Sequence, residues 1–198
     1  MSTTVFFVRH GAHDRLGRML CGRMESVSVS EQGLAQARAA ARRLRDEPVA
    51  AVYVSPMIRA AETAGPIAAV HDLEPLTDEA LDEIDLGVWT GALFEDLDHA
   101  PEWGWWNSSR SQIRAPGGES MLEVQLRVAN WMEGVRRRHA DEFIVAVSHA
   151  DVIKAALCHA LGLCLDHHGR IEVGPGSIST VVVAPWGLKV HSINEAPQ

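Results

Sequence analysis

The sequence predicts an α/β protein, a three-layer α/β/α sandwich around a mostly parallel sheet. Three short apolar runs, at residues 5–8, 49–54 and 143–147, have the length and composition of buried strands. A segment that favours helix follows each run, and this alternation is typical of parallel strands covered by helices on both faces.

The first half of the chain supplies two of these strand and helix pairs. After the first strand comes a segment rich in glycine and arginine, and Ser30 is then a suitable N-cap for a helix over residues 31–45. A second helix follows the strand at 49–54, with Pro56 in its first turn and Arg59 on its surface. Residues 76–91 mix acidic and apolar side chains, which indicates mostly loop.

The second half begins with residues 92–118, where tryptophans alternate with helix-breaking residues. We expect an inserted helical cap region over the C-terminal edge of the strands, with Trp103, Trp105 and Trp106 in its core rather than in a pocket wall. A long amphipathic helix over 121–135 precedes the strand at 143–147 and a helix at 151–161. Residues 177–184 and 188–193 form a closing hairpin.

Composition limits the classes of function. The 198 residues, 46% hydrophobic and 22% charged, suit one domain over 1–198. A net charge of −8 argues against nucleic acid or an anionic membrane as partner. No run approaches the roughly 20 apolar residues of a membrane helix and no leader precedes the first strand, so the cytoplasm is the expected location. The composition is compatible with a homodimer as well as a monomer.

Three cysteines, Cys21, Cys158 and Cys164, lack paired spacing. An odd number without a CxxC pair fits reduced core thiols better than disulfides or a zinc site.

Each of the three predicted parallel strands ends in polar residues. Arg9 and His10 follow the first, Ser55 leads from the second to Arg59, and His149 follows the third. The carboxyl ends of parallel strands meet at one edge of a sheet, where ligands bind in α/β proteins. Because the chain as a whole is acidic, an anionic ligand must be gathered by a local cluster of this kind.

Five short motifs extend this pattern along the chain. They are Arg9-His10-Gly11, Ser55-Pro56-x-x-Arg59-x-x-x-Thr63-Ala64, Leu81-x-Glu83 with Gly87-x-Trp89-x-Gly91, Pro116-Gly117-Gly118-Glu119-Ser120, and Ser148-His149. In this order they resemble the histidine phosphatase superfamily, branch 1, the phosphoglycerate mutase-like proteins. The resemblance implies a phosphomonoester hydrolase that needs no metal or cofactor and acts on a small phosphorylated metabolite.

The resemblance also implies a role for each site residue. His10 is the nucleophile and becomes phosphohistidine, so it must be neutral, with its second nitrogen bound to a backbone carbonyl. Arg9, Arg59 and a protonated His149 supply positive charge around the phosphoryl group. Backbone N–H groups of Gly11 and Ala150, near helix N-termini, assist them. Glu83 donates a proton to the leaving alkoxide and then accepts one from water.

The chain departs from the family pattern at four positions. His13, Leu16 and Cys21 stand where polar residues often contact phosphate, so a neutral donor is expected to be missing there. Thr90 replaces a common glutamate, and we expect this change to affect loop packing rather than chemistry.

Three alternatives stay open at this stage. A metallohydrolase would use side chains from the set His10, His13, Asp14, His149 and Asp151, although Arg9 and Arg59 would repel a cation. A catalytically silent phospholigand-binding module would need the cations but not Glu83. A phosphoglycerate mutase-type enzyme would need an enclosing lid, and the short segment between Gly91 and Pro116 favours a phosphatase.

Overall fold

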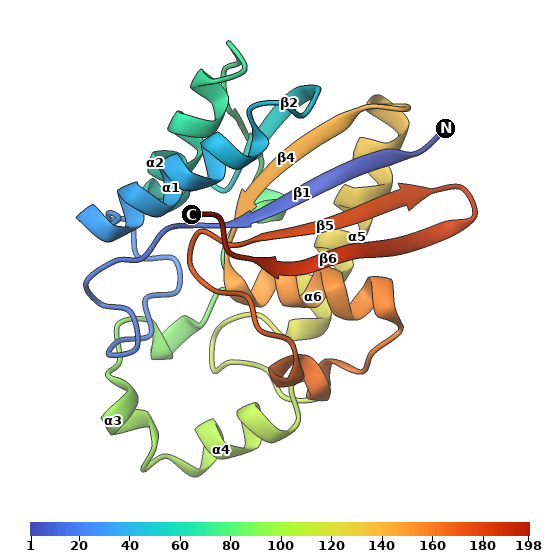
Figure 1. The fold of residues 1–198 in the computed structure, drawn as a ribbon. Coiled ribbons are helices and arrows are strands. Elements are labelled where there is room, and N and C mark those ends of the chain that lie inside the picture. Colours follow the sequence, from blue (N-terminus) through green and yellow to red (C-terminus); the bar gives the residue numbers. More distant parts are fainter.

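The computed structural model describes all residues, 1–198, and contains one six-stranded sheet (Figure 1). Its strand order is β3-β2-β4-β1-β5-β6. Strands β1, β2, β3 and β4 run parallel, and the hairpin of β5 and β6 adds two antiparallel pairings beside β1. The strands are β1 (Thr3–Arg9), β2 (Val49–Val54), β3 (Leu76–Thr77), β4 (Phe143–Ser148), β5 (Ile178–Ala184) and β6 (Gly187–Glu195).

Four helices cover the two faces of this sheet, as the sequence predicts (Figure 1). Helices α1 (Glu31–Leu44) and α2 (Ile58–Ala69) pack on one face, and α5 (Met121–Arg138) and α6 (Ala150–Leu161) on the other. The alternating side chains of β1 divide between two cores: Phe6 packs with the α1 and α2 side, while Phe7 packs with the α5 and α6 side. The three-layer α/β/α architecture is confirmed.

Local capping explains where the main helices begin. The Ser30 hydroxyl accepts a hydrogen bond from Gly33 N at 3.2 Å, and Ser120 forms a reciprocal capping box with Glu123 at the start of α5. Helix α2 begins at Ile58, after the N-cap Met57. The expectation that Pro56 lies in the first turn of α2 is therefore wrong, because Pro56 precedes the N-cap.

Residues 76–91 are mostly loop, as expected, with three short regular pieces. Strand β3 pairs with β2, and two 3₁₀ turns, η1 (Glu79–Leu81) and η2 (Gly87–Trp89), follow it. A two-residue strand is too short for periodicity to reveal. Glu83 lies between the two turns.

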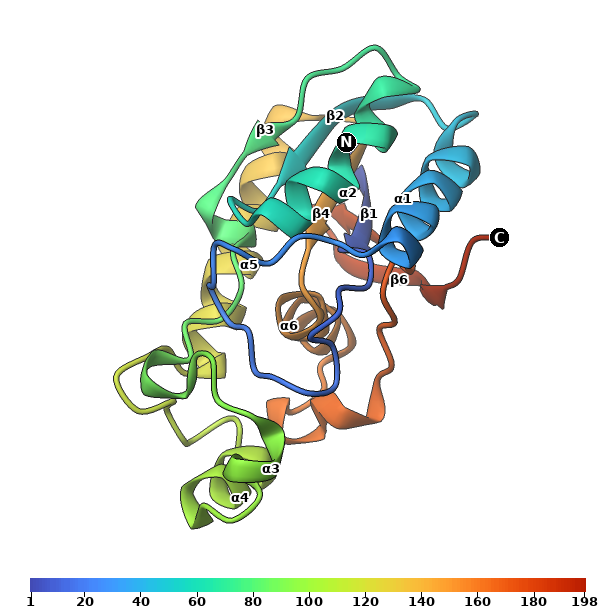
Figure 2. The same ribbon diagram turned by 90° about the vertical axis from the view of Figure 1, so that its left-hand side faces the viewer.

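The predicted cap region contains two helices, α3 (Phe94–Leu97) and α4 (Pro101–Ser108). They lie near the loop that follows β1, beyond the ends of the parallel strands (Figure 2). A third 3₁₀ segment, η3 (Leu165–Arg170), connects α6 toward β5. No helix of the protein has the length and apolar character required to span a membrane.

The tryptophans of the cap differ in environment. Trp106 is fully buried and meets Trp89 edge-on, with ring centroids 5.9 Å apart, and Trp103 packs on the same core. Trp105 is 60% exposed, so the expectation of a core position is wrong for this residue. Its outward direction follows from α4, a short helix that can bury only one side.

The cysteines are all free. Cys21 and Cys158 are buried, as expected for core thiols, but Cys164 is exposed. Cys164 lies in the turn between α6 and η3, which the apolar residues around it did not indicate.

Candidate active site

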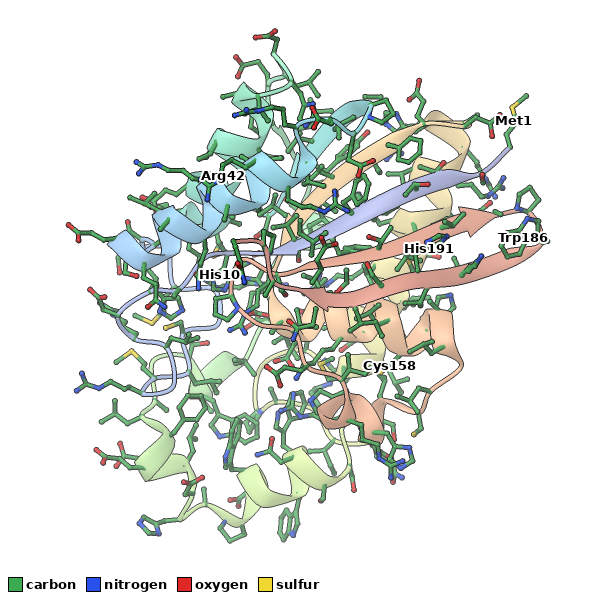
Figure 3. All side chains as sticks on the ribbon, viewed as in Figure 1. Met1, His10, Arg42, Cys158, Trp186 and His191 are labelled. Carbon is green, nitrogen blue, oxygen red and sulfur yellow. The ribbon has the colours of Figure 1, made fainter.

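The ends of β1 and β4 bring two buried histidines together. His10 follows β1 directly and donates its backbone N–H to Ser148 O at 2.9 Å, which ties it to the end of β4. The ring of His149, the next residue along, lies 5.1 Å from the ring of His10 between centroids. Figure 3 shows His10 at the carboxyl end of β1, far from Trp186 at the tip of the hairpin.

The His10 ring is fixed and neutral. Its Nδ1 lies 2.8 Å from Gly11 O, an acceptor that holds the Nδ1–H tautomer and leaves Nε2 with a free lone pair. Burial, together with the charges of Arg59 and Arg9, keeps the pKa of His10 well below its usual value of 6.5. The expectations of a neutral ring and a backbone acceptor agree with this geometry.

Two guanidinium groups border the pocket beside His10. Arg9 Nη1 donates to Val173 O at 2.7 Å, and Arg59 Nη2 donates to Gly22 O at 2.6 Å. In both arginines the Nε atom is buried and has no hydrogen-bond partner. Buried donors without partners are costly, so these groups are suited to a ligand that accepts hydrogen bonds.

Glu83 lies in the same pocket, on the loop between η1 and η2. Its Oε1 accepts the Ile84 N–H at 3.0 Å, and its Oε2 lies 3.6 Å from His149 Nδ1. Burial raises the pKa of Glu83 to about 7, and the negative charge of Asp151 adds to this shift. The carboxyl group is therefore poised to exchange a proton near neutral pH.

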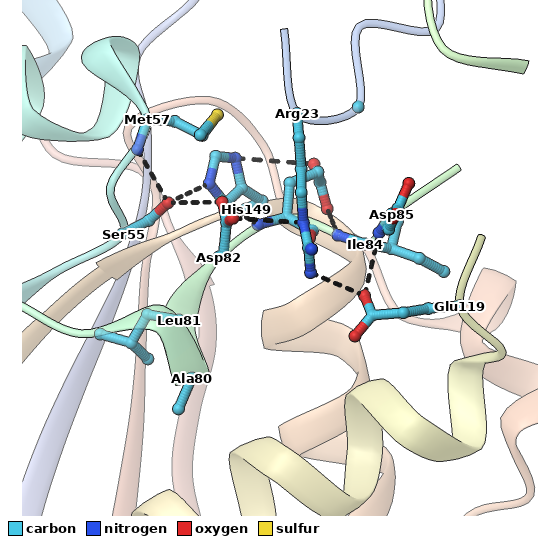
Figure 4. Close-up of polar contacts among 12 residues, drawn as sticks. Arg23, Ser55, Met57, Ala80, Leu81, Asp82, Ile84, Asp85, Glu119 and His149 are labelled. Atoms are coloured by element: carbon cyan, nitrogen blue, oxygen red, sulfur yellow. Dashed lines mark hydrogen bonds and ion pairs between the residues drawn. The ribbon is translucent and has the colours of Figure 1, made fainter. Parts of the chain in front are cut away.

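His149 belongs to a hydrogen-bonded chain that the sequence did not indicate (Figure 4). Its Nε2 lies 2.8 Å from Ser55 Oγ, and the Ser55 hydroxyl donates to Asp82 Oδ1 at 3.3 Å. Arg59 Nη2 lies 3.3 Å from the other ring nitrogen. These partners fit a neutral ring that donates from Nε2 and accepts at Nδ1.

The contacts of His149 therefore differ from the expectation of a protonated ring, because the Arg59 guanidinium faces Nδ1 as a donor. Burial and the charge of Arg59 keep the pKa of His149 well below 6.5. The positive charge of the pocket comes from Arg9 and Arg59.

A set of ion pairs holds this chain and the Glu83 loop in place. Asp82 Oδ2 lies 3.2 Å from Arg23 Nε, and Arg23 Nη2 lies 2.9 Å from Glu119 Oε2 (Figure 4). Glu119 also accepts the Asp85 N–H at 2.9 Å. The Pro-Gly-Gly-Glu-Ser motif thus acts at a distance, because its glutamate anchors the loop that carries Glu83.

The two predicted backbone donors differ. Gly11 N donates to Thr63 Oγ1 at 3.0 Å and Gly11 belongs to no helix, so the expectation of a free amide at a helix N-terminus is wrong. Ala150 is the first residue of α6 and lines the pocket, where its N–H has no acceptor within the helix. Thr63 lies one helical turn after Arg59, and its hydroxyl donates to Arg59 O at 2.7 Å. The four-residue spacing of Arg59 and Thr63 in their motif therefore places both side chains at this site.

His13 occupies the pocket where the sequence suggested a missing donor. Its ring stacks on that of His10 at 5.5 Å between centroids, and its buried Nδ1 has no hydrogen-bond partner. Burial and the charges of Arg59 and Arg9 lower its pKa to about 4. Leu16 and Cys21 line the same pocket without a hydrogen bond into it, and Phe94 of α3 adds an apolar wall. None of the three cap tryptophans lines this pocket.

The metal-ligand set considered from the sequence does not assemble. No group of three or more His, Cys, Asp or Glu side chains is placed to hold a metal ion. Two of its members have other partners: His149 binds Ser55, and Asp151 faces Arg110 at 3.5 Å.

Comparison with protein families agrees with this geometry. The model of the histidine phosphatase superfamily (branch 1) matches residues 5–196, a range that includes every pocket residue named above. The chain belongs to branch 1 of the histidine phosphatase superfamily. The fold is therefore that of a histidine phosphatase.

Individual relatives include enzymes with named substrates. Phosphoserine phosphatase 1 of Hydrogenobacter thermophilus is 36% identical over 155 residues, which cover 77% of this chain and 74% of the relative. Phosphoglycerate mutase-like protein 4 of Arabidopsis thaliana is 33% identical over 157 residues, 76% of this chain and 68% of the relative. A solved mycobacterial glucosyl-3-phosphoglycerate phosphatase has a TM-score of 0.87 at 23% identity, covering 98% of this chain and 100% of that one. The last similarity is one of fold.

Proposed function

We propose that this histidine phosphatase is a phosphomonoester hydrolase that forms a phosphohistidine on His10 and uses no metal. One observation carries the proposal. Three residues around the neutral His10, namely Arg9, Arg59 and His13, each bury a nitrogen that has no partner. A phosphoryl group in front of His10 Nε2 would supply oxygen acceptors for these nitrogens and negative charge for the guanidinium groups.

The chemistry follows from the protonation states of the site. His10 Nε2 attacks phosphorus with its lone pair, and the bond from phosphorus to the ester oxygen breaks. Protonated Glu83 gives its proton to that oxygen, which leaves as an alcohol. Glu83, now a carboxylate, takes a proton from water as the water attacks the phosphohistidine. Inorganic phosphate and neutral His10 result, with Glu83 protonated again.

Three observations favour a phosphatase over the alternatives. Glu83 contacts the same histidine cluster as the nucleophile, whereas a silent binding module would not need an acid there. The pocket walls carry two guanidinium groups, which oppose a divalent cation. The relative that is 36% identical over most of the chain is named a phosphatase, which supports hydrolysis over mutase-type transfer.

The first test is the substitution His10→Ala. We expect wild-type protein to hydrolyse p-nitrophenyl phosphate in the presence of a chelator and His10→Ala to be inactive, because Nε2 is the attacking atom. Rapid quenching of wild-type protein with labelled substrate should give an acid-labile, alkali-stable phosphoenzyme that the variant lacks. His99→Ala, at an exposed histidine, is the control and should behave as wild type. Labelling that persists in His10→Ala would exclude His10 as the nucleophile.

A further inference from the structure

Asp151 is an acid in a pocket whose other charged walls are mainly cationic. It is the second residue of α6, directly after Ala150, and its side chain lines the pocket with 26% of its surface exposed. The proposed reaction gives it no role, because Glu83 alone exchanges the proton. A carboxylate there needs an explanation, since it would repel the phosphate that the arginines attract.

The two acids of the pocket are in different protonation states. Burial opposes ionisation of Asp151, but the charges of Arg110, Lys154 and Arg9 outweigh burial and lower its pKa. Asp151 in turn contributes to the raised pKa of Glu83. Of the two acids, Glu83 therefore keeps its proton to a higher pH, and Asp151 is a carboxylate at neutral pH.

The partners of Asp151 leave it with free acceptor capacity. Arg110 Nη1 lies 3.5 Å from its Oδ1 and His168 Nε2 lies 3.9 Å away. No hydrogen bond to either carboxylate oxygen accompanies these two contacts. A carboxylate can accept about four hydrogen bonds, so a donor on a ligand in the pocket can reach it.

Arg110, which belongs to the cap region, faces the carboxylate of Asp151. Its Nη2 donates to Asn107 Oδ1 at 2.8 Å, and its guanidinium carbon lies 4.7 Å from the centroid of the Trp106 ring. Trp106 is fully buried, so both contacts fix Arg110 to a rigid part of the cap. Arg110 and His168 both face Oδ1, so Asp151 is held at the pocket wall while its Oδ2 has no partner.

We propose that Asp151 binds an ammonium group on the alcohol part of the substrate, so that the enzyme prefers phosphate monoesters of amino alcohols. The inference rests on the proposed function, which places the phosphoryl group at His10. The leaving oxygen then faces Glu83, and the rest of the alcohol extends to the neighbouring Asp151. An ammonium group donates charge-assisted hydrogen bonds to a carboxylate, whereas a hydroxyl group gains less there and a second anion is repelled.

Matched substrates test this preference. O-phosphoserine and 3-phosphoglycerate differ in carrying an ammonium or a hydroxyl group on the same carbon. O-phosphoethanolamine and 2-hydroxyethyl phosphate form a second such pair, without a carboxylate. We expect wild-type kcat/KM to favour the ammonium member of each pair by about tenfold to a hundredfold, as one charge-assisted hydrogen bond allows. Equal values in both pairs would overturn the inference without any variant.

The variant Asp151→Asn tests whether Asp151 causes the preference for ammonium substrates. It removes the charge but keeps the shape, and we expect the ratio within each pair to fall to about one. Any effect of the substitution on Glu83 cancels in the ratio, because both members of a pair have similar leaving groups. Glu95→Gln, at an exposed acid of α3 outside the pocket, is the matched control: it removes a negative charge of the cap but keeps Asp151, so the ammonium preference should persist. A ratio that Asp151→Asn leaves at its wild-type value would exclude Asp151 from substrate binding.

The outcome is distinguishable from failure of the proposed function. If wild-type protein hydrolyses p-nitrophenyl phosphate through phosphohistidine but does not discriminate within the pairs, only the role of Asp151 is overturned. If no ester is hydrolysed and no phosphoenzyme forms, the proposed function itself is wrong and this inference falls with it.

Discussion

The reactivity of His10 depends on three neighbours that act on one imidazole ring. Gly11 O fixes the tautomer, and the charges of Arg9 and Arg59 disfavour the protonated ring that could not attack phosphorus. The same guanidinium groups would stabilise the negative charge of the transition state. In the proposed reaction, one pair of arginines thus serves two needs, keeping His10 neutral and stabilising the phosphoryl group.

Glu83→Gln separates acid catalysis from phosphate binding. General acid catalysis is typically worth about 10²-fold to 10⁴-fold, so we expect kcat on an alkyl phosphate to fall by about that factor. An aryl ester such as p-nitrophenyl phosphate should lose much less, because p-nitrophenolate leaves without a proton. Inorganic phosphate should bind the variant at least as tightly, since an amide does not repel the dianion.

The pH profile gives the same test a second readout. Glu83 must be protonated when substrate binds, and its pKa is about 7, so kcat/KM on alkyl phosphates should decline as pH rises through about 7. Glu83→Gln should lack this decline, whereas Glu79→Gln, at an exposed acid of η1, should keep it. Equal losses on both ester classes with a lowered melting temperature would mean that Glu83 only holds its loop.

At the residue scale, sequence identified the groups that follow strand ends. Arg9, His10 and His149 could be placed together because parallel strands end at one edge, and the motif spacing added Arg59. The sequence could not reveal which polar groups are already occupied. The bond from Gly11 N to Thr63, and the neutral state of His149, depend on contacts between residues far apart in the chain.

Among the elements, helix α1 determines where the loop after His10 can lie. Ser30 N donates to Ala12 O at 2.8 Å, and Gln36 accepts the Ala12 N–H at 2.8 Å. Gly33 faces the same loop, where a Cβ atom would overlap Ala12 O and lie 2.9 Å from Val29 Cβ. The glycine is therefore required by the close approach of two backbones rather than by an unusual dihedral angle.

Gly33→Ala tests this contact. We expect the added methyl group to push the loop away from α1, lowering both the melting temperature and kcat/KM on p-nitrophenyl phosphate, because His13 moves with the loop. Gly104→Ala in α4 is the control within a helix, since a Cβ there meets nothing within 4 Å. That control should keep its activity and gain up to about 1 kcal/mol in stability from helix propensity. A fully active Gly33→Ala protein would show that the loop tolerates displacement.

The helices and strands also show what the periodicity of apolar residues can and cannot predict. The strands at 49–54 and 143–147 and the start of α5 are where the pattern predicts them, because each depends on a local run of apolar residues or a cap. The outward position of Trp105 and the exposure of Cys164 depend instead on which side of a short helix or turn meets the core.

For the whole molecule, the charge gathered in the pocket is opposite in sign to the net charge of the chain. The chain carries a net charge of −8, yet its pocket gathers Arg9 and Arg59. Four neutral, largely buried histidines also have lowered pKa values, with burial as the first cause in each: His10, His13, His149 and His168. Holding these rings uncharged links the stability of the fold to pH.

The sign of this linkage can be worked out. Unfolded histidines bind protons below about pH 6.5, whereas these folded rings do not, so their contribution to stability is fully present above that pH and is lost as pH falls. Glu83 acts in the opposite direction, because its folded pKa of about 7 exceeds the usual 4.5, and it stabilises the fold on acidification. Four histidines lower the stability of the fold on acidification and only Glu83 raises it, so stability falls overall as pH falls.

We therefore expect the free energy of unfolding, measured with urea, to fall between pH 7 and pH 5. A histidine with a folded pKa of about 4 contributes about 2 kcal/mol to this fall, estimated from its lowered pKa. His13→Gln removes one such ring from the pocket wall, so its free energy of unfolding should fall by about 2 kcal/mol less than that of wild type over the same range. His99→Gln, at an exposed position of the cap, should match wild type at both pH values. If His13→Gln and wild type lose equal stability on acidification, His13 is protonated in the folded protein, and its place as a neutral donor beside His10 would be wrong.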